Sequence, residues 1–194
     1  TRFRSGSQHL FRVDDEITSD LDAAATEQFS KYALPAIQDA DLVVLSDYAK
    51  GALPLLLLEK IIAHAKAKGK MIIADPKRAD ISVYSGVDLL TPNLAELQNT
   101  TDQILSSIEA IGQAATALAK EFGIGSILTT MSARGMMLSK ANGTQFHDPA
   151  STRDIFDVSG AGDTVVAMIA GALVAGADLE DAIRLANHAA SVAI

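Results

Sequence analysis

The chain has 194 residues, a formal net charge of −8, 48% hydrophobic residues and no cysteine. The length fits one domain, or one large piece of a somewhat larger one, and the composition is ordinary for a globular protein with a core. The negative charge provides no basic field for nucleic acid or an anionic membrane, so we expect neither partner. The lack of cysteine excludes disulfide scaffolds and thiolate metal sites and agrees with a cytoplasmic location. No apolar run approaches the roughly 18 residues that span a bilayer.

Strand and helix patterns alternate along the chain. A strand or ribbon is expected over residues 1–14, and a helix begins near Ser19-Asp20. Short apolar runs typical of buried parallel strands follow, separated by helical patterns. The expected strands are 41–46, 71–74, 87–90 and 126–130, and the expected helices are 54–68, 94–98, 104–122, 162–175 and 179–194. This alternation predicts a layered α/β domain with a mostly parallel sheet.

A β-hairpin is expected in the second half of the chain. Met136–Ser139 and Thr144–His147 flank a turn that contains Asn142-Gly143, and Asn-Gly is typical of a two-residue hairpin turn.

Polar residues follow four of the expected parallel strands: Asp47, Asp75, Asn93 and Thr129-Thr130. In open α/β sheets, ligands bind beyond the carboxyl ends of the strands. We therefore expect these side chains to converge on one binding rim.

Asp157–Thr164 reads D-V-S-G-A-G-D-T and leads into an apolar helix. Gly160, Ala161 and Gly162 are small enough for the backbone to approach a ligand closely. The start of the helix offers free N–H groups and the positive end of its dipole, which favour an anion. Taken alone, the segment is explained equally well as a tight turn in which Asp163 is a first-turn acid.

The whole octapeptide resembles the C-terminal signature of the ribokinase-like (PfkB) carbohydrate kinases, where Thr is more usual at the place of Ser159. The resemblance implies a ribokinase-like three-layer α/β/α fold and ATP-dependent phosphoryl transfer to a sugar. In this interpretation Gly160, Ala161 and Gly162 form the anion hole, and Asp163 accepts the proton of the sugar hydroxyl. Phosphoryl transfer requires chiefly positioning, charge neutralisation and a base that orients the nucleophile.

Thr91–Glu96 resembles the Asn-x-x-Glu element of the same family, which implies that Asn93 and Glu96 organise Mg²⁺, mainly through water. Carboxylate and amide oxygens suit a hard cation that keeps much of its hydration. The alternative is that Asn93 caps a helix and Glu96 completes a capping box, and both interpretations can hold together.

Leu128–Gly135 resembles the segment in which family members hold ATP. The resemblance implies that Thr129, Thr130 and Gly135 contact the nucleotide, together with Gly160 and Gly162. Asn187 matches an Asn that lies near the adenine in relatives, and its alternative role is an amide on a helix surface.

Leu45–Ala52 and Ala74–Lys77 look closest to the members of the family that phosphorylate D-glycero-D-manno-heptose 7-phosphate, including the kinase half of a bifunctional enzyme of ADP-heptose synthesis. This implies transfer to the anomeric O1, which gives the 1,7-bisphosphate for lipopolysaccharide core synthesis. The N-terminal residues also resemble this group, except that Gln8-His9 stands where two adjacent Gln are usual.

The distal phosphate of such a sugar requires cations. The candidate substrate residues are Arg4, Arg12, Asp47, Lys50 and Lys77. Each cation is explained alternatively as a solvated charge, and Asp47 as the cap of the following turn.

The resemblance covers the whole chain but only the latter two-thirds of a typical member. It implies that residues 1–194 form a single ribokinase-like domain without its N-terminal third, most of its lid and its C-terminal end. It also implies a homodimer and leaves open a fused nucleotidyltransferase domain. Two other hypotheses stay open: a related kinase for another sugar, sugar phosphate or nucleoside, and a nucleotide-binding module without turnover.

Overall fold

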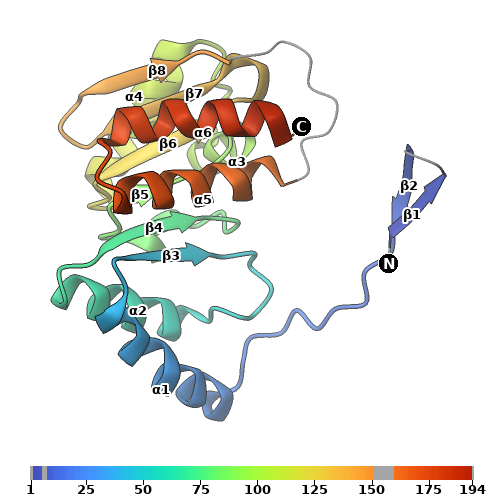
Figure 1. Ribbon diagram of the computed structural model, residues 1–194, viewed down its shortest axis with the longest axis vertical. Helices are drawn as coiled ribbons and strands as arrows, with labels where there is room; N and C mark the ends of the chain where they lie inside the picture. The colour runs from blue at the N-terminus through green and yellow to red at the C-terminus, as the bar shows by residue number, and fades with distance from the viewer. Residues whose placement is uncertain (1, 6–7, 151–159, 194) are drawn as a thin grey trace.

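A computed structural model describes residues 2–5, 8–150 and 160–193. Its main sheet has six strands in the order β3-β4-β5-β6-β7-β8 (Figure 1). Neighbours from β3 to β6 pair in parallel, whereas β6, β7 and β8 pair antiparallel. The strands are β3 (Leu42–Ser46), β4 (Met71–Asp75), β5 (Leu89–Leu90), β6 (Ser126–Thr130), β7 (Met136–Lys140) and β8 (Gln145–Asp148).

Helices cover both faces of this sheet. Successive residues of a strand point to opposite faces, and β4 shows the consequence: Ile72 and Ala74 join one buried cluster, whereas Ile73 joins the other. The first cluster includes residues of α1 (Ala23–Asp39), α2 (Leu55–Ala67), α3 (Leu94–Thr101) and α4 (Ile108–Glu121). The second includes residues of α5 (Ala161–Val174) and α6 (Leu179–Ala193), which lie side by side in Figure 1. The predicted three-layer α/β/α fold with a mostly parallel sheet is therefore confirmed.

Side-chain caps set helix boundaries that apolar periodicity missed. The predicted helix over 104–122 begins in fact at Ile108, because the Ser107 hydroxyl accepts a hydrogen bond from the amide of Ala110 (3.1 Å). Ile104 lies outside the helix and is 93% exposed. Similarly, α1 begins after Asp22, whose carboxylate accepts from the amide of Ala25 (2.7 Å).

The β7–β8 hairpin is confirmed, but its predicted two-residue turn is wrong. The amide of Gly143 donates to the carbonyl of Lys140 (2.9 Å), and the amide of Lys140 donates to the carbonyl of Thr144 (2.9 Å). Gly143 has φ +94°, whereas Asn142 is not among the residues with positive φ. A two-residue Asn-Gly turn needs positive φ at both residues, so this connection is a three-residue loop that ends in a left-handed glycine.

Gly135 closes η2 (Ser132–Arg134), the turn between β6 and β7, with φ +81° and ψ −138°. A Cβ there would lie 2.0 Å from the carbonyl oxygen of Asp148 and 2.6 Å from the amide of Ala150. We expect Gly135→Ala to lower the free energy of unfolding by roughly 2–4 kcal/mol in urea titrations. Gly143→Ala is the matched control: its Cβ would meet nothing within 4 Å, so only strain of about 1 kcal/mol applies. Equal losses in the two variants would contradict the steric argument.

The N-terminal residues form a separate antiparallel sheet of β1 (Arg2–Ser5) and β2 (Gln8–Arg12). Figure 1 shows this ribbon away from the three layers. The rings of Phe3 and Phe11 stack across it at 4.4 Å between centroids. The predicted ribbon is confirmed. None of the helices in the described part of the chain combines the length and apolar character of a membrane span.

Candidate active site

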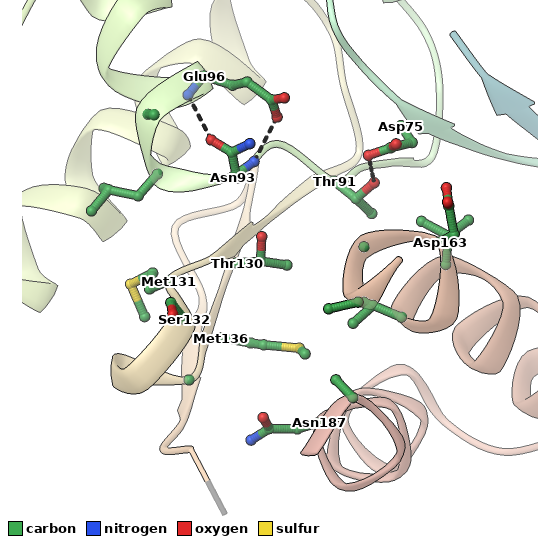
Figure 2. A pocket seen from close by; sticks show the side chains of 18 of the residues that line it. Asp75, Thr91, Asn93, Glu96, Thr130, Met131, Ser132, Met136, Asp163 and Asn187 are labelled. Carbon is green, nitrogen blue, oxygen red and sulfur yellow. Dashed lines mark hydrogen bonds between the residues drawn. The ribbon is translucent and has the colours of Figure 1, made fainter. Parts of the chain in front are cut away.

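A cavity of about 700 Å³ lies at the carboxyl ends of the parallel strands (Figure 2). Its volume falls within the usual range for sites that bind small molecules. Strand ends, the start of α3, the η2 turn and helices α5 and α6 all contribute to its wall. The polar and small residues that matter below are Tyr48, Asp75, Lys77, Asn93, Glu96, Thr130, Gly135, Gly160, Ala161, Gly162, Asp163 and Asn187.

The first turn of α5 forms one wall of the cavity. Gly160 is the N-cap in the left-handed conformation (φ +87°), and no side chain caps the turn. A Cβ added at Gly160 or Gly162 would meet no described atom within 4 Å, so the space beside this backbone is open. Free N–H groups at a helix start attract anions, which suits a phosphate. Asp157, Val158 and Ser159 of the octapeptide lie outside the described residues.

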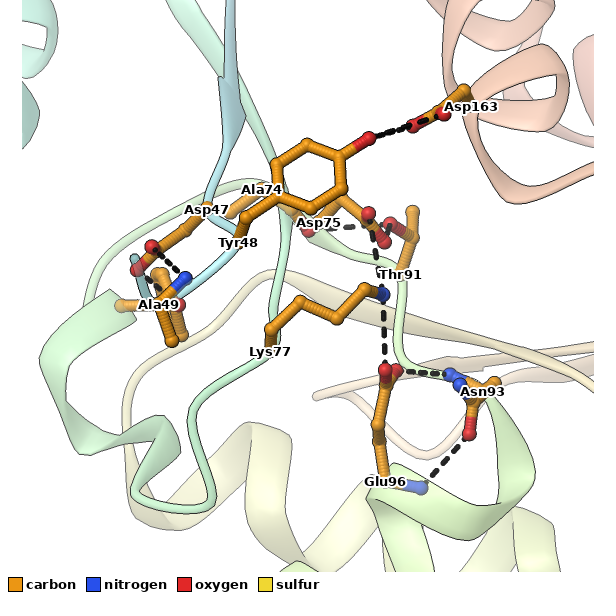
Figure 3. Close-up of polar contacts among 11 residues, drawn as sticks. Asp47, Tyr48, Ala49, Ala74, Asp75, Lys77, Thr91, Asn93, Glu96 and Asp163 are labelled. Carbon is orange, nitrogen blue, oxygen red and sulfur yellow. Dashed lines mark hydrogen bonds and ion pairs between the residues drawn. The ribbon is translucent and has the colours of Figure 1, made fainter. Parts of the chain in front are cut away.

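Asp163, in this first turn, is exposed on the cavity wall and accepts hydrogen bonds from the Tyr48 hydroxyl. The distances from the phenol oxygen to Oδ1 and Oδ2 are 3.0 and 3.1 Å (Figure 3). The hydrogen bond to Asp163 is the chief reason why the pKa of Tyr48 lies above its ordinary value. Tyr48 was not among the site residues expected from the sequence, although its position directly after Asp47 at the end of β3 places it near the predicted rim.

Asn93 and Glu96 form a reciprocal capping box at the start of α3. Asn93 Oδ1 accepts from the amide of Glu96 (2.9 Å), and Glu96 Oε2 accepts from the amide of Asn93 (2.8 Å). Asn93 also forms an isolated parallel β-bridge with Thr130 of β6, and this backbone pairing brings both residues to the same rim of the cavity. The capping interpretation is confirmed, and the second carboxylate oxygen of Glu96, Oε1, pairs with Lys77 instead.

Lys77 joins two acids across this rim. Its ammonium lies 2.9 Å from Glu96 Oε1 and 3.4 Å from Asp75 Oδ2 (Figure 3). Burial raises the pKa of Asp75, although the charge of Lys77 opposes the shift. Burial alone would lower the pKa of Lys77, but the hydrogen bond to Glu96 and the charge of Asp75 outweigh it and raise that pKa. The three side chains therefore form one charged cluster facing the start of α5.

This cluster fits a hydrated Mg²⁺ better than a protein-only cage. Within the described residues, no group of three or more His, Cys, Asp or Glu side chains could enclose a metal. Mg²⁺ in nucleotide sites usually keeps several waters and binds through one or two carboxylates plus phosphate oxygens. Asp75 and Glu96 are two such carboxylates on the cavity wall.

The other end of the cavity is more apolar, with Met131, Met136 and Ala190 in its wall. Asn187 lies there on α6 and is 6% exposed, so the interpretation as a surface amide is wrong (Figure 2). Its Nδ2 donates to Asp148 Oδ2 (2.6 Å) and to the carbonyl of Pro149 (2.8 Å). An apolar slot with a few fixed polar groups suits a nucleobase.

The structure separates the two threonines expected at the end of β6. Thr130 lines the cavity, whereas Thr129 is fully buried, outside the cavity lining, and its hydroxyl lacks a hydrogen-bond partner among the described residues. Strand alternation explains the difference, because adjacent residues point to opposite faces.

Among the expected substrate residues whose side chains the structure describes, only Lys77 lines the cavity. Asp47 is 2% exposed and accepts hydrogen bonds from Arg78 Nε (2.6 Å) and the Tyr84 hydroxyl (2.7 Å). It also accepts from the amide of Ala49 (2.8 Å), so its interpretation as the cap of the turn is confirmed. Lys50 pairs with Glu16. Arg4 and Arg12 belong to the β1–β2 ribbon.

Comparison with known proteins identifies the family. The profile of the pfkB family carbohydrate kinases matches residues 5–194. The chain is 42% identical over 194 residues to the bifunctional protein HldE of Paramagnetospirillum magneticum, and 39% identical over 193 residues to that of Shewanella baltica. The whole chain covers only 40% of each of these two relatives.

Solved structures share the fold. The ribokinase of Arabidopsis thaliana, in complex with ribose and ATP, superposes with a TM-score of 0.72 at 26% identity, over 81% of this chain and 51% of the ribokinase. Phosphofructokinase-2 of Escherichia coli, in complex with potassium, gives a TM-score of 0.76 at 19% identity, over 89% of this chain and 56% of that one. With a family match over residues 5–194 and these three-layer neighbours, the chain belongs to the pfkB family of carbohydrate kinases.

Proposed function

We propose that the protein transfers the γ-phosphoryl group of ATP to the anomeric O1 of D-glycero-D-manno-heptose 7-phosphate, giving the 1,7-bisphosphate. One observation gives the main support for phosphoryl transfer. Asp163 and the open first turn of α5 line the same cavity as the cluster of Lys77, Asp75 and Glu96. One side offers a base and anion-binding N–H groups, and the other offers oxygen ligands for a metal. Positioning and charge neutralisation of this kind are what phosphoryl transfer requires.

Each part of the cavity has a role in this proposal. Asp163 accepts the proton of the sugar hydroxyl, and the backbone of Gly160–Gly162 binds the oxygens of the transferred phosphoryl group. Glu96 and Asn93 hold the waters of Mg²⁺, with Asp75 beside them, and the metal neutralises phosphate charge when bound. Thr130 and Gly135 contact ATP, and the apolar end near Asn187 takes its adenine.

The heptose substrate is supported by two observations. Leu45–Ala52 and Ala74–Lys77 resemble heptose 7-phosphate kinases, and the relatives named HldE are 39–42% identical over the chain. Lys77 is proposed to contact the transferred phosphate, because it lies in the cluster opposite α5. Arg4 and Arg12 stay predictions for the distal phosphate. Asp47 and Lys50 are not proposed as substrate contacts, because Asp47 is paired with Arg78 and Lys50 is paired with Glu16.

The wider setting of the protein is part of the same proposal. The relatives are named bifunctional proteins, and this chain covers 40% of them. We propose that residues 1–194 belong to one kinase domain of a cytoplasmic homodimer and that a nucleotidyltransferase domain accompanies it. Sedimentation of the full-length protein and an assay for ADP-heptose formation test these two points.

The substrate is tested by offering the purified full-length protein a panel of acceptors with Mg-ATP and measuring ADP release. The panel contains the heptose 7-phosphate, the unphosphorylated heptose, fructose 6-phosphate, ribose and adenosine. We expect the largest kcat/KM with the heptose 7-phosphate. Preference for another acceptor would support a different kinase of the family, and ATP binding without ADP release from any acceptor would support a module without turnover.

The Glu96→Gln variant distinguishes the proposed role of Glu96 in binding Mg²⁺ from its role in the capping box of α3. Gln also completes a capping box, so the start of α3 is retained while the carboxylate charge is lost. We expect the Mg²⁺ concentration for half-maximal rate to rise about tenfold. Glu109→Gln, in the first turn of α4 and outside the cavity lining, is the control and should leave it unchanged. An unchanged Mg²⁺ dependence in Glu96→Gln would remove Glu96 from the metal site.

A further inference from the structure

Tyr48 occupies a position that core packing does not explain. Its side chain is 51% exposed, and it lines the cavity opposite the first turn of α5. Its hydroxyl donates to the carboxylate of Asp163, 115 residues further along the chain, at 3.0 and 3.1 Å from the two oxygens (Figure 3). The contact therefore joins two segments at the cavity and contributes little to the buried core.

The backbone on both sides of Tyr48 is anchored. The amide of Asp47 donates to the carbonyl of Asp75 (3.1 Å), and the buried Asp47 carboxylate is held as described above. On the other side, the carbonyl of Gly51 accepts from the amide of Leu21 (3.0 Å), and Gly51 has no room for a Cβ, which would lie 2.0 Å from the Ser19 carbonyl oxygen. Since both ends are fixed, the phenol is presented to Asp163 from a defined position.

The Tyr48 hydroxyl is placed where it can orient the carboxylate of Asp163. The Asp163 side chain is exposed, and among the described residues Tyr48 is the donor to its carboxylate. Rotation about the bond that carries a carboxylate is otherwise broad. A carboxylate has two oxygens with about four acceptor sites, so Asp163 can keep Tyr48 on one oxygen and accept the sugar hydroxyl on the other.

We propose that Tyr48 is a positioning residue for Asp163. Before the sugar binds, the Tyr48 hydroxyl occupies the hydrogen-bonding position that the sugar hydroxyl later takes. After the sugar binds, Tyr48 stays on the other carboxylate oxygen and keeps the carboxylate in its orientation. This inference rests on the proposed kinase function. In the reaction, the acceptor oxygen forms a bond to the γ-phosphorus, its proton passes to Asp163, and the bond between the γ-phosphorus and the β,γ-bridging oxygen breaks to release ADP. Tyr48 keeps its own proton throughout.

The test uses the full-length protein with Tyr48→Phe and the matched control Tyr32→Phe, whose ring is 73% exposed on α1. We expect Tyr48→Phe to lower kcat about tenfold, the usual scale for losing a hydrogen bond to a charged group. The KM for ATP should stay within about twofold, since nucleotide contacts are untouched. Tyr32→Phe should match the wild type.

A double-mutant cycle shows whether Tyr48 acts through Asp163. On an Asp163→Asn background, Tyr48→Phe should lower the residual kcat no further. An unchanged kcat in Tyr48→Phe alone, or the same tenfold loss on both backgrounds, would overturn the inference.

A readout without turnover distinguishes failure of this inference from failure of the proposed function. The hydrogen bond to Asp163 raises the pKa of Tyr48, so the difference titration at 295 nm between wild type and Tyr48→Phe should show a component above pH 10. In Asp163→Asn this component should move to lower pH. If it does not move, the contact is refuted. A wild type that releases no ADP from any acceptor, with the titration as expected, would refute the kinase proposal instead.

Discussion

Asp163→Asn should lower kcat by a factor of roughly 10² to 10⁴, the usual contribution of a general base, and leave the KM for ATP nearly unchanged. Asn has the same size and keeps the first turn of α5, but it cannot accept the proton of the sugar hydroxyl. Steady-state kinetics with the heptose 7-phosphate and with ATP as varied substrates measure both parameters.

The control for this variant is Asp181→Asn, which also removes a first-turn acid, from α6, away from the cavity lining. A helix-dipole contribution is worth about 0.3–1 kcal/mol of stability in either helix. If Asp163 were only a first-turn acid, both variants would lose that stability and retain kcat. A normal kcat in Asp163→Asn would therefore reject its role as base.

Asp47→Ala should lower the free energy of unfolding by about 3–5 kcal/mol. The change leaves Arg78 without its anion and deprives the Tyr84 hydroxyl of its acceptor in a fully buried side chain. Unpaired buried polar groups cost more than the net gain of the pairs they formed. Urea titration, followed by amide exchange in β3 and β4, reports the loss in the region concerned.

Asp80→Ala is the control for this prediction. Asp80 caps η1 (Ile81–Tyr84) through the amide of Ser82 (3.0 Å), but it is exposed. We expect a loss of about 1 kcal/mol, the usual value for a cap. A loss in Asp47→Ala no larger than in Asp80→Ala would show that the Asp47 contacts are dispensable.

Local patterns in the sequence were sufficient for the fold class and for part of the cavity. Buried apolar runs and helical periodicity predicted a layered α/β domain with a mostly parallel sheet, because side-chain direction repeats with a fixed period in each element. The three-layer arrangement was implied by the family resemblance. The strand pattern also brought Asp75, Asn93 and Thr130 to one rim, since parallel strands share the edge where they end. Thr129 was expected there too, but the strand has the predicted bounds, and adjacent residues of a strand point to opposite faces, so only Thr130 of the two lines the cavity.

Contacts between distant segments could not be read from the chain. Lys77 reaches Glu96 over 19 residues, and Tyr48 reaches Asp163 over 115. Neither spacing follows a helical or strand period, so no local pattern indicates the pair. For the same reason the sequence did not indicate that Asp47 is buried and accepts a hydrogen bond from the Tyr84 hydroxyl.

β6 is paired in parallel with β5 on one side and antiparallel with β7 on the other. The antiparallel strand therefore starts at the rim where the parallel strands finish, and the short turn Met131–Gly135 lines the cavity without any crossover helix. The end of the cavity at this turn and the end at α5 are thus built from different parts of the chain. Under the proposed function, we expect changes in this turn to alter which nucleotide is accepted and to leave the acid–base geometry at α5 unchanged, so that donor choice and chemistry would be separable traits.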